Sequence, residues 1–294
     1  MANTRDIRRR IKSIKNTAQI TKAMQMVAAS KMRRAQQVAL AGRPYAEQMN
    51  LILNSVHHAA HEGITHPFLE ERENNNPGVL LISTDKGLCG GLNTNLFREV
   101  TKLPESTQFV TIGRKGKQFL ARTNRNLVAD FEIRENATAF QVKQVSQFMI
   151  DLFLEKKIDS ISVLLPHYVN TLSQEPILVP ILPIQEVAKL HVPLSKNQPA
   201  AVDHPRTNPS EYLFEPHPKE LLGKLLPYYV HFLIFQLLLD ARASEHSARM
   251  VAMKNATDNA KQIVKDLTLE YNKVRQAAIT NEILEIATAQ MALS

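Results

Sequence analysis

Apolar residues near the start of the chain recur at alternating steps of four and three. Residues 1–41 contain neither glycine nor proline, and the recurring positions begin at Ile7, Ile11 and Ile14. The later positions are Ala18, Thr21, Gln25, Ala28, Met32, Ala35 and Ala39. This spacing is the heptad seam of a coiled coil. Because its later members are small or polar, they bury little apolar area, and the helix needs a closely packed partner.

A second seam lies near the C-terminus. No proline follows Pro227 and no glycine follows Gly223, so residues 228–294 are free of helix breakers. The seam consists of Met253, Thr257, Ala260, Val264, Leu267, Tyr271, Val274 and Ala278. Ordinary globular helices are much shorter, at about 8–20 residues. We therefore expect the two long helices to wrap around each other. Their pairing should be antiparallel, because the intervening chain joins the end of one to the start of the other.

Between the two helices the pattern changes to short apolar runs. They lie at 78–84, 108–113, 127–132, 160–166 and 175–184, with helix-like stretches at 92–103, 115–123 and 139–157. Strands that alternate with helices predict a mainly parallel sheet covered by helices. The last run contains three prolines, which place it at a sheet edge because proline cannot donate to a ladder. We expect a Rossmann-like α/β domain of about five strands.

The predicted fold is an α/β domain inserted into a long antiparallel two-helix coiled coil. Its expected parts are an N-terminal helix over 1–60, the α/β domain over 77–185, a proline-rich linker over 186–218 and a C-terminal helix over 219–294. The apolar run Leu225–Leu239 is shorter than the roughly 20 residues that cross a bilayer. We interpret it as a buried helix face.

The net charge of +8 is concentrated in the first helix. Residues 1–36 hold ten basic side chains against a single acid, Asp6, so the rest of the chain is slightly acidic. This asymmetry predicts an anionic partner: nucleic acid, lipid headgroups or acidic protein loops. The last nine residues, 286–294, carry no charged side chain. They predict either a tip that inserts into a partner of low polarity or a frayed tail.

The stretch STDKGLCGGLN, residues 83–93, follows a predicted strand and holds three of the nine glycines and the only cysteine, Cys89. A phosphate-binding P-loop needs Lys and Ser/Thr after its last glycine, where this chain has Leu92 and Asn93. We interpret the stretch as a tight strand-to-helix turn whose glycines permit close packing, and Cys89 as a small buried residue. An anion site at the helix start and a nucleotide-using enzyme stay open as alternatives.

Histidines give little sign of a metal site. His57 and His61 are four residues apart, with His58 between them, and a third ligand of matched geometry is not evident. A single cysteine also gives no disulfide framework and no zinc-ligand spacing. We therefore predict neither a metal nor a cofactor.

Three long blocks of the sequence resemble the gamma subunit of bacterial F-type ATP synthases. They are residues 7–36, 83–97 and 244–286, in the family's order along the chain. The resemblance implies a central rotor shaft that couples rotation of the membrane c-ring to conformational changes of three catalytic beta subunits. It implies that the chain is itself non-catalytic. The implied partners are the alpha and beta ring, the epsilon subunit and the c-ring, at the cytoplasmic face of the bacterial inner membrane.

The resemblance also implies individual contact residues. Those toward the alpha and beta ring are Met24, Lys31, Arg33, Arg34, Lys86, Arg275, Gln276, Thr280 and Glu282. In the family the methionine lies near the arginine–glutamine pair. The segment 211–216 resembles the foot, where Tyr212, Phe214 and Glu215 meet the c-ring and epsilon. Phe214 stands where a second tyrosine is expected, so one hydroxyl contact is lost.

A basic helical hairpin that binds nucleic acid is the alternative function. Such proteins stack bases on aromatic side chains among their basic residues. Residues 1–44 contain no Phe, Tyr or Trp. The sequence therefore favours a protein partner over a nucleic acid.

Overall fold

The computed structural model describes residues 4–59, 66–70, 72–73, 75–133, 138–184, 215 and 218–293. It divides into two compact units. Met1–Ala29 together with Arg249–Ser294 form the coiled-coil unit, and Ser30–Ala248 form the α/β unit. Two helices, α1 (Thr4–Ala41) and α6 (Pro218–Leu293), contribute residues to both units.

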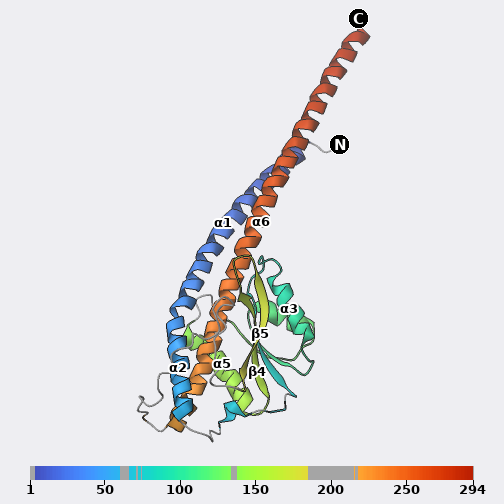
Figure 1. Ribbon diagram of the computed structural model, residues 1–294. Coiled ribbons are helices and arrows are strands. Elements are labelled where there is room, and N and C mark those ends of the chain that lie inside the picture. The colour runs from blue at the N-terminus through green and yellow to red at the C-terminus, as the bar shows by residue number, and fades with distance from the viewer. Residues whose placement is uncertain are drawn as a thin grey trace. The chain divides into compact units, whose positions relative to one another are not determined.

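The coiled-coil unit is built from the two predicted seams. Within it α1 and α6 run side by side in opposite directions (Figure 1). The seam residues are buried or half-buried, except Ala278, which is exposed. Thr21 and Thr257 meet at the centre of this interface, where their hydroxyl oxygens lie 2.7 Å apart. The predicted antiparallel coiled coil is therefore confirmed.

Small seam residues explain how the two backbones approach each other. Ala28 of α1 and Ala260 of α6 are 2% and 6% exposed, although neither presents much apolar surface. Burying a hydroxyl is costly unless it is hydrogen-bonded, and the Thr21–Thr257 pair satisfies both groups. Each hydroxyl also lies within hydrogen-bond reach of a carbonyl on its own helix.

The end of α6 lies beyond the coiled-coil interface. Val264, Leu267, Tyr271 and Val274 are half-buried, whereas every residue from 275 to 290 is exposed. Figure 1 shows this part of the helix continuing past the N-terminal end of α1. It presents four large apolar side chains to solvent: Ile279, Ile283, Leu284 and Ile286.

The α/β unit contains the five predicted strands. They are β1 (Pro77–Ile82), β2 (Gln108–Ile112), β3 (Leu127–Phe131), β4 (Ser160–Tyr168) and β5 (Gln174–Leu182). The sheet order is β3-β2-β1-β4-β5. The first four strands are parallel, and β5 pairs antiparallel to β4 at an edge. The mainly parallel sheet and its proline-bearing edge strand are both as predicted.

Helices cover both faces of the sheet. On one face Val79 and Leu81 pack with α3 (Leu92–Lys102) and α4 (Arg114–Arg122). On the other face the alternate residues, Leu80 and Ile82, join a larger core. That core includes residues of α2 (Arg43–Ala59), the short helix η1 (Pro67–Leu69), α5 (Ala139–Leu154) and α6. This arrangement explains why β1 is apolar at successive positions rather than at alternate ones.

The N-terminal helical region is divided at Gly42. The sequence predicts one helix over 1–60, whereas α1 ends at Ala41 and α2 begins at Arg43. A Cβ atom at position 42 would collide with the side chain of Gln236 on α6. Glycine therefore permits a close approach between the α1–α2 junction and α6.

The apolar run Leu225–Leu239 lies in α6 as a core segment. By length and composition alone α6 is able to cross a membrane, yet half of its most apolar window is buried within the structure. Leu226, Val230 and Leu237 are completely buried in the core of the α/β unit. Their burial also explains how Pro227 is tolerated inside the helix, since tertiary packing offsets the lost backbone hydrogen bond.

Two glycines of the α/β unit differ sharply in their surroundings, and substitution by alanine should separate them. Gly113 has a φ of +103°, and a Cβ atom there would collide with the backbone of Ser83. A Cβ atom at Gly87 would meet open space. We expect Gly113→Ala to lower the free energy of unfolding by about 3 kcal/mol or more. Gly87→Ala should change it by less than about 0.5 kcal/mol in the same urea titration. Equal effects would contradict this assignment.

The threonine pair of the coiled coil is testable by a double-mutant cycle. Thr21→Val or Thr257→Val alone leaves one buried hydroxyl without its cross-helix partner and should cost about 1 kcal/mol. The double variant should cost less than the sum, because the second substitution no longer removes a cross-helix contact. Urea denaturation followed by circular dichroism measures all four chains. Strictly additive costs would show that the two hydroxyls do not interact.

Candidate functional site

The loop after β1 occupies the position where open α/β sheets usually bind ligands. From β1 the chain proceeds to β2 on one side, while β4 pairs with β1 on the other. The carboxyl end of β1 is therefore the topological switch point of the sheet. Residues 83–91 follow β1 and lead into α3. What fills this position decides whether the loop is able to bind a nucleotide.

The first residues of the loop cap helix α4. Ser83, Thr84 and Asp85 each accept a hydrogen bond from one of the first backbone N–H groups of that helix. The pairs are Gly116 N to Ser83 Oγ at 2.8 Å, Lys115 N to Thr84 O at 3.0 Å and Arg114 N to Asp85 Oδ1 at 3.2 Å. Free N–H groups at a helix start form anion sites, but these three already have partners. The STD sequence thus serves as a cap supplied by a neighbouring loop.

The glycines of the loop have a different role from the one expected. A Cβ atom would meet nothing within 4 Å at Gly87, and only an Asn95 side-chain atom at 3.9 Å at Gly91. Gly90 instead supplies a positive φ of 59°. The prediction that the loop glycines permit close packing is therefore wrong for Gly87 and Gly91. The close packing is found at Gly113 and Gly116, where a Cβ atom would collide with Ser83.

Cys89 is buried, as predicted. It is 3% exposed and packs with Leu92 and with Ala248 of α6. The side-chain amide of Asn93 donates to the hydroxyl of Thr84 at 2.8 Å and lies 3.4 Å from the Cys89 sulfur. The loop is thus packed against α6 on its inner side.

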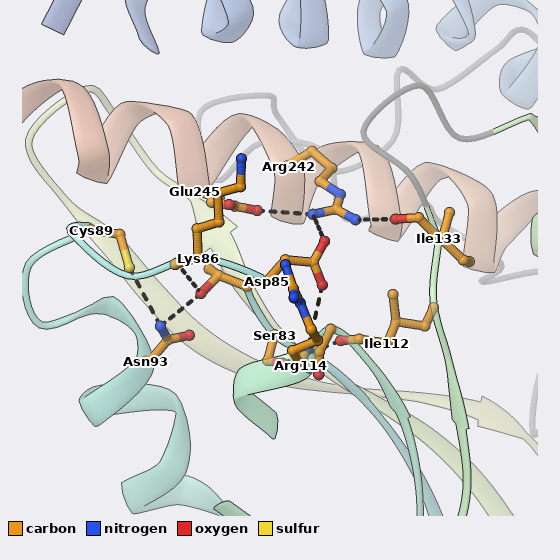
Figure 2. A network of polar contacts seen from close by, with 12 residues as sticks. Ser83, Asp85, Lys86, Cys89, Asn93, Ile112, Arg114, Ile133, Arg242 and Glu245 are labelled. Carbon is orange, nitrogen blue, oxygen red and sulfur yellow. Dashed lines mark hydrogen bonds and ion pairs between the residues drawn. The ribbon is translucent and has the colours of Figure 1, made fainter. Parts of the chain in front are cut away.

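A buried arginine joins the same loop to α6. Figure 2 shows Arg242 extending from α6 between Asp85, Glu245 and the end of the segment after β3. Its Nη2 donates to the carbonyl oxygen of Ile133 at 2.9 Å. Its Nη1 donates to Glu245 Oε2 at 3.0 Å and lies 3.8 Å from Asp85 Oδ2. We call these four residues the Arg242 cluster.

The Arg242 cluster pairs a buried charge through the two terminal nitrogens of the guanidinium, while its Nε has no hydrogen-bond partner among the described residues. The side chains of Arg242 and Glu245 are 7% and 8% exposed, and that of Asp85 is 30% exposed. A buried charge requires paired and hydrogen-bonded neighbours. The planar guanidinium donates in fixed directions and so reaches several elements at once. This cluster was not predicted from the sequence. Its only signal is the pairing of Arg242 with Glu245 three residues later in a run of Ala and Ser.

A second buried polar pair joins β4 to α6. His167 Nδ1 lies 2.6 Å from Asp240 Oδ2, and the backbone N–H of Tyr168 reaches Asp240 Oδ1 at 3.4 Å. Burial raises the pKa of the Asp240 carboxyl above its ordinary value, while the hydrogen bond and charge of His167 act in the opposite direction. This stretch of α6 is therefore tied to the rest of the α/β unit by polar contacts at Asp240 and Arg242, which lie within one helical turn.

Most of the contact residues implied by the resemblance lie on the surface. Met24 is half-buried on α1. The exposed ones are Lys31, Arg33, Arg34, Lys86, Arg275, Gln276, Thr280, Glu282 and Glu215. Tyr212 and Phe214 lie outside the described residues. Their exposure is compatible with contacts to other subunits.

Met24 does not lie near Arg275 and Gln276. The Thr21–Thr257 contact sets the register of the antiparallel helices, so Met24 stands level with α6 residues close to 254. Arg275 is about 30 Å further along α6, at 1.5 Å per residue. The expected proximity is therefore wrong for this chain, and the two residues belong to different levels of the coiled-coil unit.

The histidine cluster adds no metal site to the described structure. His57 and His58 lie on α2, and His61 falls outside the described residues. Among the residues that the structure describes, no group of three His, Cys, Asp or Glu side chains is placed to hold a metal ion.

Comparisons with known proteins agree with this architecture. A family model described as ATP synthase matches residues 3–293. The ATP synthase gamma chain of Opitutus terrae is 52% identical over 294 residues, which cover 99% of both chains. The chain belongs to the ATP synthase gamma chain family. The gamma chain of Methylacidiphilum infernorum is 50% identical over the full length of both chains. The resemblance seen in the sequence is confirmed.

Solved structures share the fold. A chain of the rotor of the Euglena gracilis mitochondrial ATP synthase matches with a TM-score of 0.60 at 17% identity, over 94% of this chain and 98% of that one. A chain of its OSCP/F1/c-ring structure matches with a TM-score of 0.64 at 18% identity, over 99% and 94%. The nucleic-acid-binding alternative has no support in these comparisons.

The pKa direction of Asp240 predicts a pH-dependent stability. Below the pKa of an unfolded Asp, about 3.9, the carboxyl is protonated in both states. As the pH rises toward the higher pKa in the folded protein, the unfolded state releases its proton first, so folding loses stability. The variant Asp240→Asn has no carboxyl to titrate at this position. As the pH rises, its free energy of unfolding should therefore increase relative to that of the unaltered chain. Urea denaturation between about pH 3.5 and 5.5 measures the difference, and a constant difference would contradict the raised pKa.

Proposed function

We propose that this chain is the central shaft of a rotary ATP synthase. It couples rotation of the membrane c-ring to the conformational changes of three catalytic beta subunits. The observation that carries the proposal is the coiled-coil unit with its exposed extension of α6. Sixteen consecutive exposed residues, 275–290, extend for about 24 Å, and no other helix or strand among the described residues covers them. Such a helix gains a partner by entering the bore of a surrounding ring.

Asymmetry of the shaft supports this role. A ligand shifts a conformational equilibrium only through contacts that differ between the states. A coiled coil of two unlike helices presents different side chains in different directions. On α1 these include the exposed basic residues Arg8, Arg9 and Lys12, while the extension of α6 presents Ile279 and Ile283. Three identical beta subunits around this shaft meet different surfaces and so adopt different states.

The charge distribution supports an assignment of the ring-facing contacts. Basic side chains of α1 and of the loop after β1 attract acidic segments of beta. We assign Lys31, Arg33, Arg34 and Lys86 to this role. At the level of the α6 extension we assign the polar residues Arg275, Gln276, Thr280 and Glu282. Met24 contacts the ring at the height of α6 residues close to 254.

The chain itself contributes no catalytic group in this proposal. In support of this, α6 packs against the loop at the switch point of the sheet, and the STD residues of the loop cap α4. ATP is made in the beta subunits in this proposal. Its foot, including Glu215 with Tyr212 and Phe214, meets epsilon and the c-ring. We infer from this proposed contact a peripheral subunit at the cytoplasmic face of the bacterial inner membrane.

Assembly and truncation test the proposed function together. Co-expressed with alpha and beta chains, the full chain should purify in one complex with them. A chain that ends at Glu285 should still assemble and support ATP hydrolysis. Its ratio of protons pumped to ATP hydrolysed should fall by about twofold or more, because contacts of the tip with the ring are lost.

The control for this truncation is a substitution elsewhere. Leu172→Ser removes an apolar side chain that is 80% exposed in the turn between β4 and β5. It should leave assembly and the pumping ratio unchanged. A full chain that stays monomeric beside alpha and beta would refute the proposed shaft. An unchanged ratio in the truncated chain would remove the tip from the coupling.

A further inference from the structure

The loop after β1 makes both an apolar and a polar contact with α6. On its inner side Cys89 packs with Ala248 in a small apolar cluster. Nearer β1, Asp85 faces Arg242. The loop also carries Lys86, an exposed residue whose side chain extends toward α6 beside Glu245 (Figure 2), and Leu88, whose side chain is 61% exposed at a positive φ of 64°. The loop thus carries two exposed side chains while its base is held against the helix.

Asp85 is the link between α4 and α6. Its Oδ1 accepts from the first N–H group of α4, and its Oδ2 faces the guanidinium of Arg242. The carboxylate therefore lies between the positive end of a helix dipole and a buried cation. Both neighbours restrict its orientation, and Lys86 follows it directly in the chain.

Arg242 has no surface role that would explain its presence. Its side chain is 7% exposed, so it does not reach a partner directly. Apolar side chains of similar size would fill a buried helix position without the cost of burying charge. What the guanidinium adds is simultaneous contact with three elements: the loop through Asp85, the segment after β3 through the Ile133 carbonyl, and α6 itself through Glu245.

We propose that Arg242 is a positioning residue for rotary coupling. It holds the loop that contains Lys86 against α6. The loop therefore rotates together with the helix and does not shift relative to it. This inference rests on the proposed shaft function, in which Lys86 contacts a beta subunit. A contact loop that moves independently of α6 absorbs part of each rotation step as local motion. Arg242 suppresses that motion from inside the α/β unit.

Arg125 provides a matched control. It is also an arginine that joins backbone carbonyls, since Nη1 donates to Leu103 O at 3.1 Å and Pro104 O at 2.9 Å, and Nη2 to Thr101 O at 3.3 Å. These acceptors lie at the end of α3 and in the turn after it, away from the Arg242 cluster. Loss of Arg125 weakens the α/β unit without releasing the loop from α6.

The experiment compares Arg242→Met with Arg125→Met in two measurements. The first is the mobility of a spin label at position 88, introduced by Leu88→Cys in a Cys89→Ser chain. The second is the ratio of protons pumped to ATP hydrolysed, measured without the label in the full complex in vesicles. Arg242→Met should raise the label mobility and lower the ratio by about twofold to tenfold. Arg125→Met should alter neither, even where it lowers the unfolding temperature by a similar amount.

Partial substitutions sharpen the result. Asp85→Asn retains the shape of the side chain but removes its charge, and it should release the loop in the same way as Arg242→Met. Because both changes break one link, the double variant should be no worse than either single variant in the pumping ratio. Arg242→Lys should restore only part of the ratio, because lysine lacks the planar fork.

Several outcomes would overturn the proposal. Unchanged label mobility in Arg242→Met would show that the loop is held without Arg242. Raised mobility with an unchanged pumping ratio would show that the loop position does not matter for coupling. Equal losses in Arg242→Met and Arg125→Met would reduce Arg242 to a stabilising residue. If instead the unaltered chain fails to assemble or to couple, the shaft function fails, while the label measurement still decides whether Arg242 holds the loop.

Discussion

The α/β unit depends on the burial of one stretch of α6 around its whole circumference. Thirteen consecutive residues, 236–248, are buried. A helix that is covered on all sides is usually apolar throughout, yet this stretch contains charged and polar side chains. Specific contacts accommodate these side chains. Gly42 leaves room for Gln236, and His167 is hydrogen-bonded to Asp240. Asp85 forms an ion pair with Arg242, and the Thr171 carbonyl accepts a hydrogen bond from Ser247.

This burial explains features that otherwise look unrelated. The break between α1 and α2 falls where Gln236 needs room. The switch point of the sheet, usually a ligand site, is filled because Cys89 and Asp85 face α6. The helix leaves this environment at the end of the α/β unit and then needs only a narrow seam of small residues in the coiled-coil unit. One helix thus combines a core segment, a coiled-coil strand and an exposed extension.

The elements themselves could be predicted from the sequence with good accuracy. All five strands were anticipated within a few residues, because apolar runs bounded by polar turns are local signals. The two seams were anticipated because heptad spacing is also local. Proximity was harder to predict. Met24 and Arg275 were expected to be neighbours, and the Thr21–Thr257 register separates them. Register depends on how two distant segments pack, which neither segment specifies by itself.

The sequence by itself determined the fold class, the antiparallel shaft and the family, since these rest on periodicity and on long matching blocks. Only the tertiary structure decided what the STDKGLCGGLN loop does. Its sequence suggests a phosphate turn or a packing turn, whereas the structure shows a cap for α4 that is tied to α6 through Arg242. Asp85 and Arg242 are 157 positions apart in the chain. A contact between such distant residues exists only once the sheet has brought both elements to the same edge.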